Sequence, residues 1–113
     1  RTEALKEPAA EAPAGINQLR LSARWVDQAA LRYTPAGLPA LDLTLEHEGL
    51  TMEAGHPRRV QLKLQAVALG DLARRLPQLA ATDLFLWTGF MAAARNGRGV
   101  VFHITQVEAV QTV

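Results

Sequence analysis

Alternation of apolar and polar residues in three stretches constrains the fold of this chain more than any other feature of its sequence. In residues 18–25, 41–46 and 60–68, apolar side chains alternate with charged or polar ones. A period of two is that of a β-strand with one face buried and the other in water. The pattern predicts three half-buried strands, and the third is long enough to bend around a barrel.

The remainder of the chain predicts one short helix and a final hairpin. Residues 71–79 are expected to form the helix, with Asp71 capping its first turn and Pro77 limiting its extent. Residues 84–91 are apolar at nearly every position, as in a strand covered on both faces. Asn96-Gly97 is a strong hairpin turn that leads into a last strand at 100–110. This order predicts an all-β, five-stranded OB-fold barrel, with a small sandwich as the alternative that the pattern leaves open.

Composition narrows the kind of protein further. The 113 residues suit one domain, with residues 1–15, rich in Ala, Glu and Pro, as a disordered tail and 16–113 as the OB-fold domain. The chain has no cysteine, which excludes disulfides and zinc-thiolate sites. No apolar run is long enough to span a bilayer, and the first residues lack the apolar core of a signal peptide. The net charge of +1 is well short of that of a strongly basic duplex-binding protein.

Several short motifs carry a resemblance to a known family. They are NQLRLS at 17–22, LR and TPAGLP within 31–39, LTLEH at 43–47, EAG at 53–55, GFM at 89–91, NG at 96–97, His103, and QVE at 106–108. With them, residues 16 to about 110 resemble primosomal replication protein N, a small bacterial family among the single-strand-binding proteins. The combination of the TPAGLP and LEH motifs is moderately specific.

The resemblance implies a cytoplasmic, nucleoid-associated OB-fold homodimer that binds single-stranded DNA during replication restart. It would bridge the primosomal helicase and a helicase-loading protein, without a cofactor, a membrane or a small-molecule substrate. The sequence departs from the family pattern in three places. The loop between strands four and five keeps only Arg95 and Arg98, residues 60–62 lack the expected aromatic, and Glu48 replaces a common basic residue.

Single-strand binding requires cations for the phosphates and exposed rings on which bases stack. The candidate nucleic-acid-binding residues are Arg95, Arg98, Arg58, Arg59, Lys63, Arg20, Arg24, Arg32 and Tyr33. Arg20, Arg24 and Lys63 have an alternative role in cross-strand ion pairs with Asp42 and Glu46. Tyr33 could instead pack over a barrel end. The other rings, which are Trp25, Trp87, Phe85, Phe90 and Phe102, are expected in the core, with Trp87 as a weak second candidate for stacking.

Acidic residues between positions 42 and 53 support a rival hypothesis, a protein adaptor with only weak DNA binding. Glu46 and Glu48 would then contact a basic partner such as the helicase. A general single-strand coating protein is less favoured, because the chain ends without a long tail and acidic tip. The three histidines are scattered and have no metal-binding spacing, and no catalytic motif occurs. We therefore expect a binding protein with no metal, no cofactor and no enzymatic activity.

Overall fold

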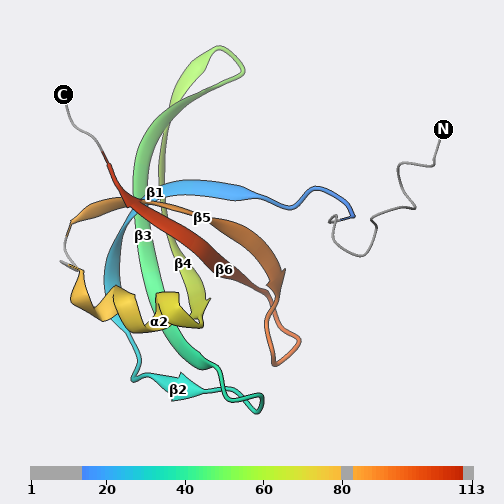
Figure 1. The fold of residues 1–113 in the computed structure, drawn as a ribbon. Coiled ribbons are helices and arrows are strands. Elements are labelled where there is room, and N and C mark those ends of the chain that lie inside the picture. The colour runs from blue at the N-terminus through green and yellow to red at the C-terminus, as the bar shows by residue number, and fades with distance from the viewer. Residues whose placement is uncertain (1–13, 80–82, 111–113) are drawn as a thin grey trace.

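The computed structural model describes residues 14–79 and 83–110, and strands dominate it (Figure 1). The elements, in chain order, are β1 (Leu19–Gln28), β2 (Arg32–Tyr33), β3 (Pro39–Glu53), β4 (His56–Leu69), α2 (Asp71–Arg75), the 3-10 helix η1 (Leu76–Gln78), β5 (Leu84–Ala93) and β6 (Val100–Ala109). The order is the predicted one, with β2 as an additional two-residue strand. The predicted tail lies, over residues 1–13, outside the described residues and stays a prediction.

The sheet closes on itself. The strand order is β1-β5-β6-β4-β3-β2, and a further antiparallel pairing joins β1 to β3. All neighbouring pairs are antiparallel except β4 with β6, which run parallel. Five strands therefore form a closed barrel in which each has two bonded neighbours. The OB-fold prediction is confirmed, and the closure rules out the open sandwich.

The alternation seen in the sequence fills the barrel. Every second side chain of β1, β3 and β4 points inward, because successive residues of a strand face opposite sides. The buried core comprises Ala23, Trp25, Leu41, Leu43, Leu45, Ala66, Ala68, Leu72, Ala73, Leu76, Trp87, Phe102 and Ile104. Three of these residues come from the helical segment: Leu72 and Ala73 from α2, and Leu76 from η1. The indole Nε1–H of Trp87 donates to the carbonyl oxygen of Ala23 at 3.0 Å, so its one polar group is satisfied within the core.

The predicted cap of the short helix is wrong. Gly70 occupies the cap position with a φ of 76°, and no side chain caps the helix. The chain reverses direction at Gly70, whose amide donates to the carbonyl oxygen of Pro39 at 2.8 Å. A positive φ is easiest for glycine, which explains why Gly70 stands at the reversal. Asp71 is therefore the first residue of the helix and not its cap. The α-helix ends at Arg75, and Pro77 lies in the 3-10 turn that follows.

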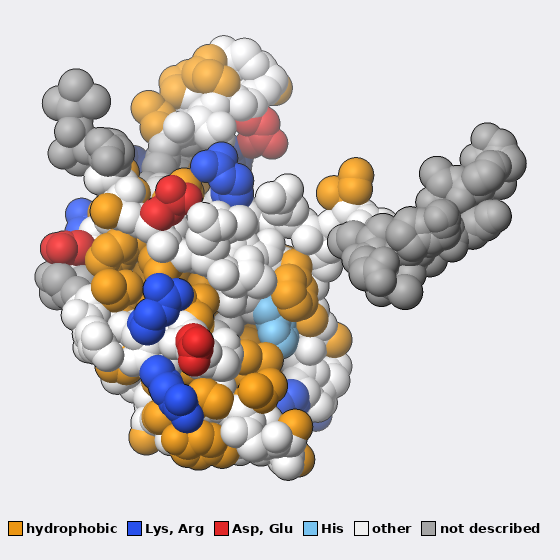
Figure 2. All heavy atoms as spheres, in the orientation of Figure 1, with side chains coloured by type: hydrophobic (Ala, Val, Ile, Leu, Met, Phe, Trp, Pro, Cys, Tyr) orange, Lys and Arg blue, Asp and Glu red, His pale blue; other side chains and the backbone are white. Residues whose placement is uncertain are grey.

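β3 and β4 extend beyond the alternating stretches at 41–46 and 60–68 that predicted them. β3 and β4 pair as far as Glu53 and His56, so only Ala54 and Gly55 form the turn. Their φ values are 52° and 81°, the positive values of a tight hairpin turn whose twist matches its strands. The two strands project from the barrel as an arm, residues 49–60 (Figure 1). The outer part of this arm carries exposed apolar side chains (Figure 2). Leu50 and Met52 are exposed by 72% and 65%.

The final hairpin is confirmed, but two details differ from expectation. The amide of Gly97 donates to the carbonyl oxygen of Ala94 at 2.8 Å, which places Arg95 and Asn96, instead of Asn96 and Gly97, at the centre of the turn. β5 is not covered on both faces, because Leu84 and Phe90 are exposed by 37% and 38%. A closed barrel has one interior, so in this single chain the outer side chains of β5 face solvent.

Candidate nucleic-acid interface

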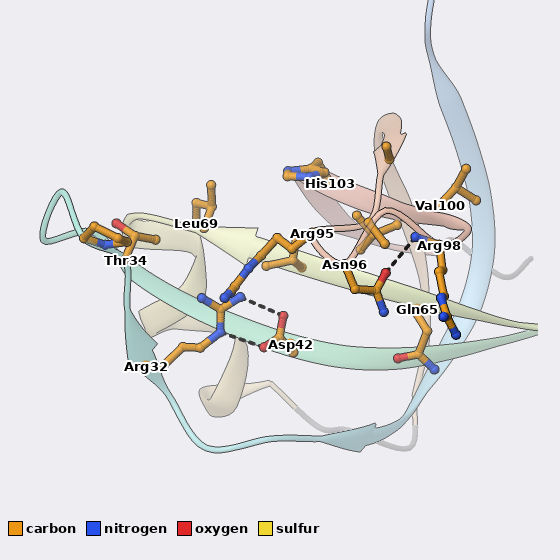
Figure 3. A pocket seen from close by; sticks show the side chains of 15 residues that line it. Arg32, Thr34, Asp42, Gln65, Leu69, Arg95, Asn96, Arg98, Val100 and His103 are labelled. Atoms are coloured by element: carbon orange, nitrogen blue, oxygen red, sulfur yellow. Dashed lines mark hydrogen bonds and ion pairs between the residues drawn. The ribbon is translucent and has the colours of Figure 1, made fainter.

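A groove of about 720 Å³ lies on the outside of the barrel (Figure 3). Its residues come from β2 and the loop after it, from β3 and β4, and from the β5–β6 hairpin. They are Arg32, Thr34, Pro35, Asp42, Gln65, Val67, Leu69, Ala93, Ala94, Arg95, Asn96, Arg98, Val100, Val101 and His103. The floor is largely apolar. The acidic and strongly basic side chains of the groove are those of Arg32, Asp42, Arg95 and Arg98. Such a surface suits a ligand with flat apolar parts and charged parts.

Strand alternation explains why these side chains face the groove. Leu41 and Leu43 point into the core, so Asp42 between them points outward. Ala66 and Ala68 are likewise buried in the core cluster, which leaves Gln65, Val67 and Leu69 on the outer face of β4. The groove is therefore built on the polar or outward positions of the same strands whose inward positions fill the barrel.

Arg32 forms an ion pair with Asp42. The Nε of Arg32 donates to Oδ2 at 2.8 Å and its Nη2 donates to Oδ1 at 3.0 Å. The hydrogen bonds from Arg32 lower the pKa of Asp42, desolvation opposes this, and the charges of Arg32 and Arg95 lower it further. The same pair raises the pKa of Arg32. Asp42 therefore pairs with Arg32, and not with the strand cations that the alternative hypothesis assigned to it.

Arg95 and Arg98 present exposed guanidinium groups at the groove. The amide of Arg98 donates to the Oδ1 of Asn96 at 2.8 Å, and the amide of Ala94 bonds across the turn to Gly99 at 3.1 Å. These bonds fix the short hairpin that carries both arginines. In Figure 3, Arg95 points toward the Arg32–Asp42 pair and Arg98 extends on the side of Gln65. The structure thus brings together three of the predicted cations, Arg32, Arg95 and Arg98, in one groove.

The other predicted cations lie elsewhere on the surface. Arg58 and Arg59 are on the arm, where Arg58 forms an exposed ion pair with Glu53 at 3.3 Å. Lys63 is exposed on the same face of β4 as Gln65, two residues further toward the arm.

The remaining candidates are on the first two strands. Arg20 and Arg24 are exposed on β1, and Arg24 is in register with Glu46. Tyr33 is exposed by 58%, but it is absent from the described residues that line the groove. Of the nine candidates, the groove itself therefore contains three.

The acidic candidates are less isolated than their sequence suggests. Glu46 lies in register with Arg24 of β1 on one side and Lys63 of β4 on the other. Glu48 accepts a hydrogen bond from the Nε2 of Gln61 at 2.8 Å. Both side chains are on the outer face of β3, whereas alternation places Glu53 on the opposite face. Glu46 and Glu48 form a short acidic patch next to the groove strands.

Aromatic side chains divide into core and surface. Trp25, Trp87 and Phe102 are buried as expected, so Trp87 is excluded as a stacking ring. The prediction for Phe90 is wrong. Its ring is partly exposed and stacks on His103, with centroids 4.9 Å apart and planes 8° apart.

His103 is a groove residue that the sequence reasoning missed. His103 and Phe90 are direct partners in the antiparallel register of β5 and β6. The position of the hairpin turn fixes this register, so the turn was the signal in the sequence that could have identified the pair. His103 therefore lines the groove with its ring supported by the stacked ring of Phe90, which is not itself a lining residue.

Two further observations concern metal sites and membrane-spanning helices. In residues 14–79 and 83–110, no group of three or more histidine, aspartate or glutamate side chains is placed to hold a metal ion. Among the same residues, no helix is long and apolar enough to cross a membrane.

Comparison with known proteins shows the family to which this chain belongs. The family described as "another single-strand binding protein family" matches residues 17–106. Replication restart protein PriB from Bordetella pertussis is 48% identical over 96 residues, which are 84% of this chain and 90% of the relative. The chain therefore belongs to the single-strand binding protein family, in the branch of the PriB replication restart proteins, as the sequence resemblance predicted.

Solved structures agree with this assignment. The structure of PriB from Ralstonia solanacearum is 35% identical and superimposes with a TM-score of 0.78, covering 86% of this chain and 100% of that one. The single-strand-binding domain of a Synechococcus protein is 20% identical, with a TM-score of 0.61 over 86% of this chain and 99% of that one, and shows the shared fold alone.

Proposed function

We propose that this protein binds single-stranded DNA in the groove between β2, β4 and the β5–β6 hairpin. The observation that carries the proposal is the placement of the exposed Arg95 and Arg98 beside an apolar floor and the His103 ring. The arginines neutralise phosphates, and bases lie on the apolar and aromatic surface. A flat floor with cations at its rim fits an unpaired strand, because the bases of a duplex are stacked on each other.

The proposal includes a role in replication restart. The matching relative from Bordetella pertussis is named a replication restart protein, and the chain would serve as a non-enzymatic accessory factor in the cytoplasm, associated with the nucleoid. It would hold the DNA while bridging the primosomal helicase and a helicase-loading protein. We also propose a homodimer, supported by exposed apolar side chains on the outer faces of β1 and β5, namely Val26, Leu84 and Phe90.

Replacing both Arg95 and Arg98 with alanine should weaken binding to single-stranded oligonucleotides and lower the salt dependence. The expected slope of log affinity against log salt falls by roughly one to two units, because two phosphate contacts are lost. Fluorescence anisotropy of a labelled oligothymidine at several salt concentrations measures both quantities. The double variant Arg74→Ala with Arg75→Ala is the matched control, since these arginines are exposed on α2 outside the groove. Equal slopes for the two double variants would refute the groove assignment.

A second candidate function is the protein adaptor with weak DNA binding. The observations that favour it are the acidic patch of Glu46 and Glu48 on the outer face of β3, and the capture of Arg32 by Asp42, which removes one cation from the groove. Steering of a basic partner by such a patch needs no deep pocket.

The adaptor function predicts that Glu46→Lys with Glu48→Lys weakens binding of the primosomal helicase at least about tenfold, the scale of a like-charge contact in an interface. DNA affinity should stay equal or rise slightly, because the new lysines attract phosphate. Pulldown of purified helicase and anisotropy of oligothymidine give the two readouts. Asp71→Lys with Asp83→Lys makes the same change of charge at two other exposed positions and is the control. Helicase binding that is indifferent to the Glu46 and Glu48 reversal would reject this function.

A further inference from the structure

The groove contains a single carboxylate, and it lies among the cations. Asp42 is one of fifteen lining residues, and its side chain remains 44% exposed although Arg32 binds both of its oxygens. A carboxylate accepts about four hydrogen bonds. Arg32 uses two of these sites, at 2.8 and 3.0 Å, so about two acceptor sites remain on a side chain that lines the groove.

Asp42 differs in chemistry from the other polar groups of the groove. The arginines only donate, whereas the side chains of Thr34, Gln65, Asn96 and His103 can both donate and accept. Asp42 alone among the lining side chains accepts without donating. It therefore repels phosphate oxygens and carbonyl oxygens, and it favours groups that carry N–H.

This contrast divides the groove between the two parts of a DNA strand. Phosphates are drawn to Arg95 and Arg98 on the hairpin, because the Arg32–Asp42 pair on the floor carries no net charge to attract them. A base that enters the floor meets Val67 and Leu69 as apolar contacts and the carboxylate of Asp42 as the acceptor. The ion pair with Arg32 holds that carboxylate in one orientation, which reduces the entropy lost when a base binds.

We infer that Asp42 makes this groove selective for bases that carry an exocyclic amino group over thymine and uracil. The inference rests on the proposed single-strand binding and adds the choice of base to it. Cytosine donates from its N4 amino group, and this pairing with an acidic side chain is a familiar form of base readout. Uracil and thymine place the O4 carbonyl oxygen where cytosine has its amino group, and their one edge donor, N3–H, stands between two carbonyl oxygens, next to which a carboxylate is unfavourable. Gln65 does not make this distinction, because an amide can serve either edge.

The test compares oligodeoxycytidine with oligodeoxyuridine of equal length. Their bases differ at position 4, which carries an amino group in cytosine and a carbonyl oxygen in uracil, and at N3, which carries a hydrogen only in uracil. Anisotropy titrations at low salt are made with the wild-type protein, with Asp42→Asn and with Arg32→Gln. We expect the wild type to bind the cytidine strand about three- to tenfold more tightly, the range of one partly exposed hydrogen bond to a charged group. Asp42→Asn should bring the ratio close to one, while affinity for the uridine strand rises as the negative charge is lost. Arg32→Gln keeps the carboxylate and should keep the preference for cytidine, with a smaller ratio because the carboxylate is no longer held in one orientation.

The outcomes separate this inference from the function on which it rests. Binding of both strands with an equal affinity by the wild type, or an unchanged ratio in Asp42→Asn, overturns the role of Asp42 and leaves single-strand binding intact. No binding of either strand at low salt overturns the proposed function itself. Loss of the preference in Arg32→Gln, with the carboxylate still present, would also contradict the assignment to Asp42.

Discussion

Replacing Gly89 with alanine is expected to destabilise the barrel by about 3 kcal/mol, at the upper end of the cost of overpacking. A Cβ at this position would lie 1.9 Å from the carbonyl oxygen of His103 and 3.0 Å from the ring of Phe102. The first neighbour is backbone and cannot rotate away, so β5 and β6 must separate. Gly89 also lies at the irregular register between β5 and β6.

Urea unfolding followed by circular dichroism measures this effect as a shift in midpoint at unchanged slope. Thr88→Ala is the matched control, because Thr88 is the neighbouring residue on β5 and its side chain points to the outer face. Because His103 lines the groove, Gly89→Ala should also weaken binding to DNA. A midpoint for Gly89→Ala equal to that of the control would show that the close approach of β5 and β6 is incorrect.

Removal of the Trp87 side chain should have the other largest effect, a loss of about 3–5 kcal/mol for Trp87→Ala. The side chain is completely buried and its ring contacts Phe85 edge to face, with centroids 5.9 Å apart. Its removal opens a cavity in the barrel. It also takes away the N–H that satisfies the carbonyl oxygen of Ala23, which adds the cost of a buried acceptor without a donor.

The comparison for this variant is Tyr33→Ala, which removes an aromatic ring exposed by 58% and should cost under about 1 kcal/mol. Circular dichroism is the suitable signal, because Trp87 is one of two tryptophans and its loss changes the fluorescence. Equal stability of the two variants would contradict the placement of Trp87 in the core.

The barrel could be predicted from the sequence because its strands have one buried face and one solvent-exposed face. Leu41, Leu43 and Leu45 alternate with polar residues, and all three are buried. The same signal disappears in the arm, where both faces are exposed and no packing enforces a period of two. The alternation therefore ends at residue 46 and resumes at residue 60, although β3 runs to Glu53 and β4 begins at His56.

The groove was only partly predictable. Arg95 and Arg98 flank a recognisable turn, so their exposure followed from local sequence. The pairing of Arg32 with Asp42 depends on where the two-residue strand β2 joins β3, and no periodicity marks such a short element. The stacking of Phe90 on His103 depends on a register across β5 and β6 that contains an irregularity. Contacts between strands thus required the three-dimensional structure.

The central claim, that the groove holds single-stranded DNA, is tested most directly by mapping the contact surface in solution. Backbone amide chemical shifts of the isotope-labelled protein are followed by NMR during titration with a short oligothymidine. We expect the largest shifts at residues 32–35, 65–69 and 94–103, and small shifts at 71–75 of α2, which lies outside the groove. Shifts concentrated on α2 or on the arm, with the groove amides unchanged, would contradict the account.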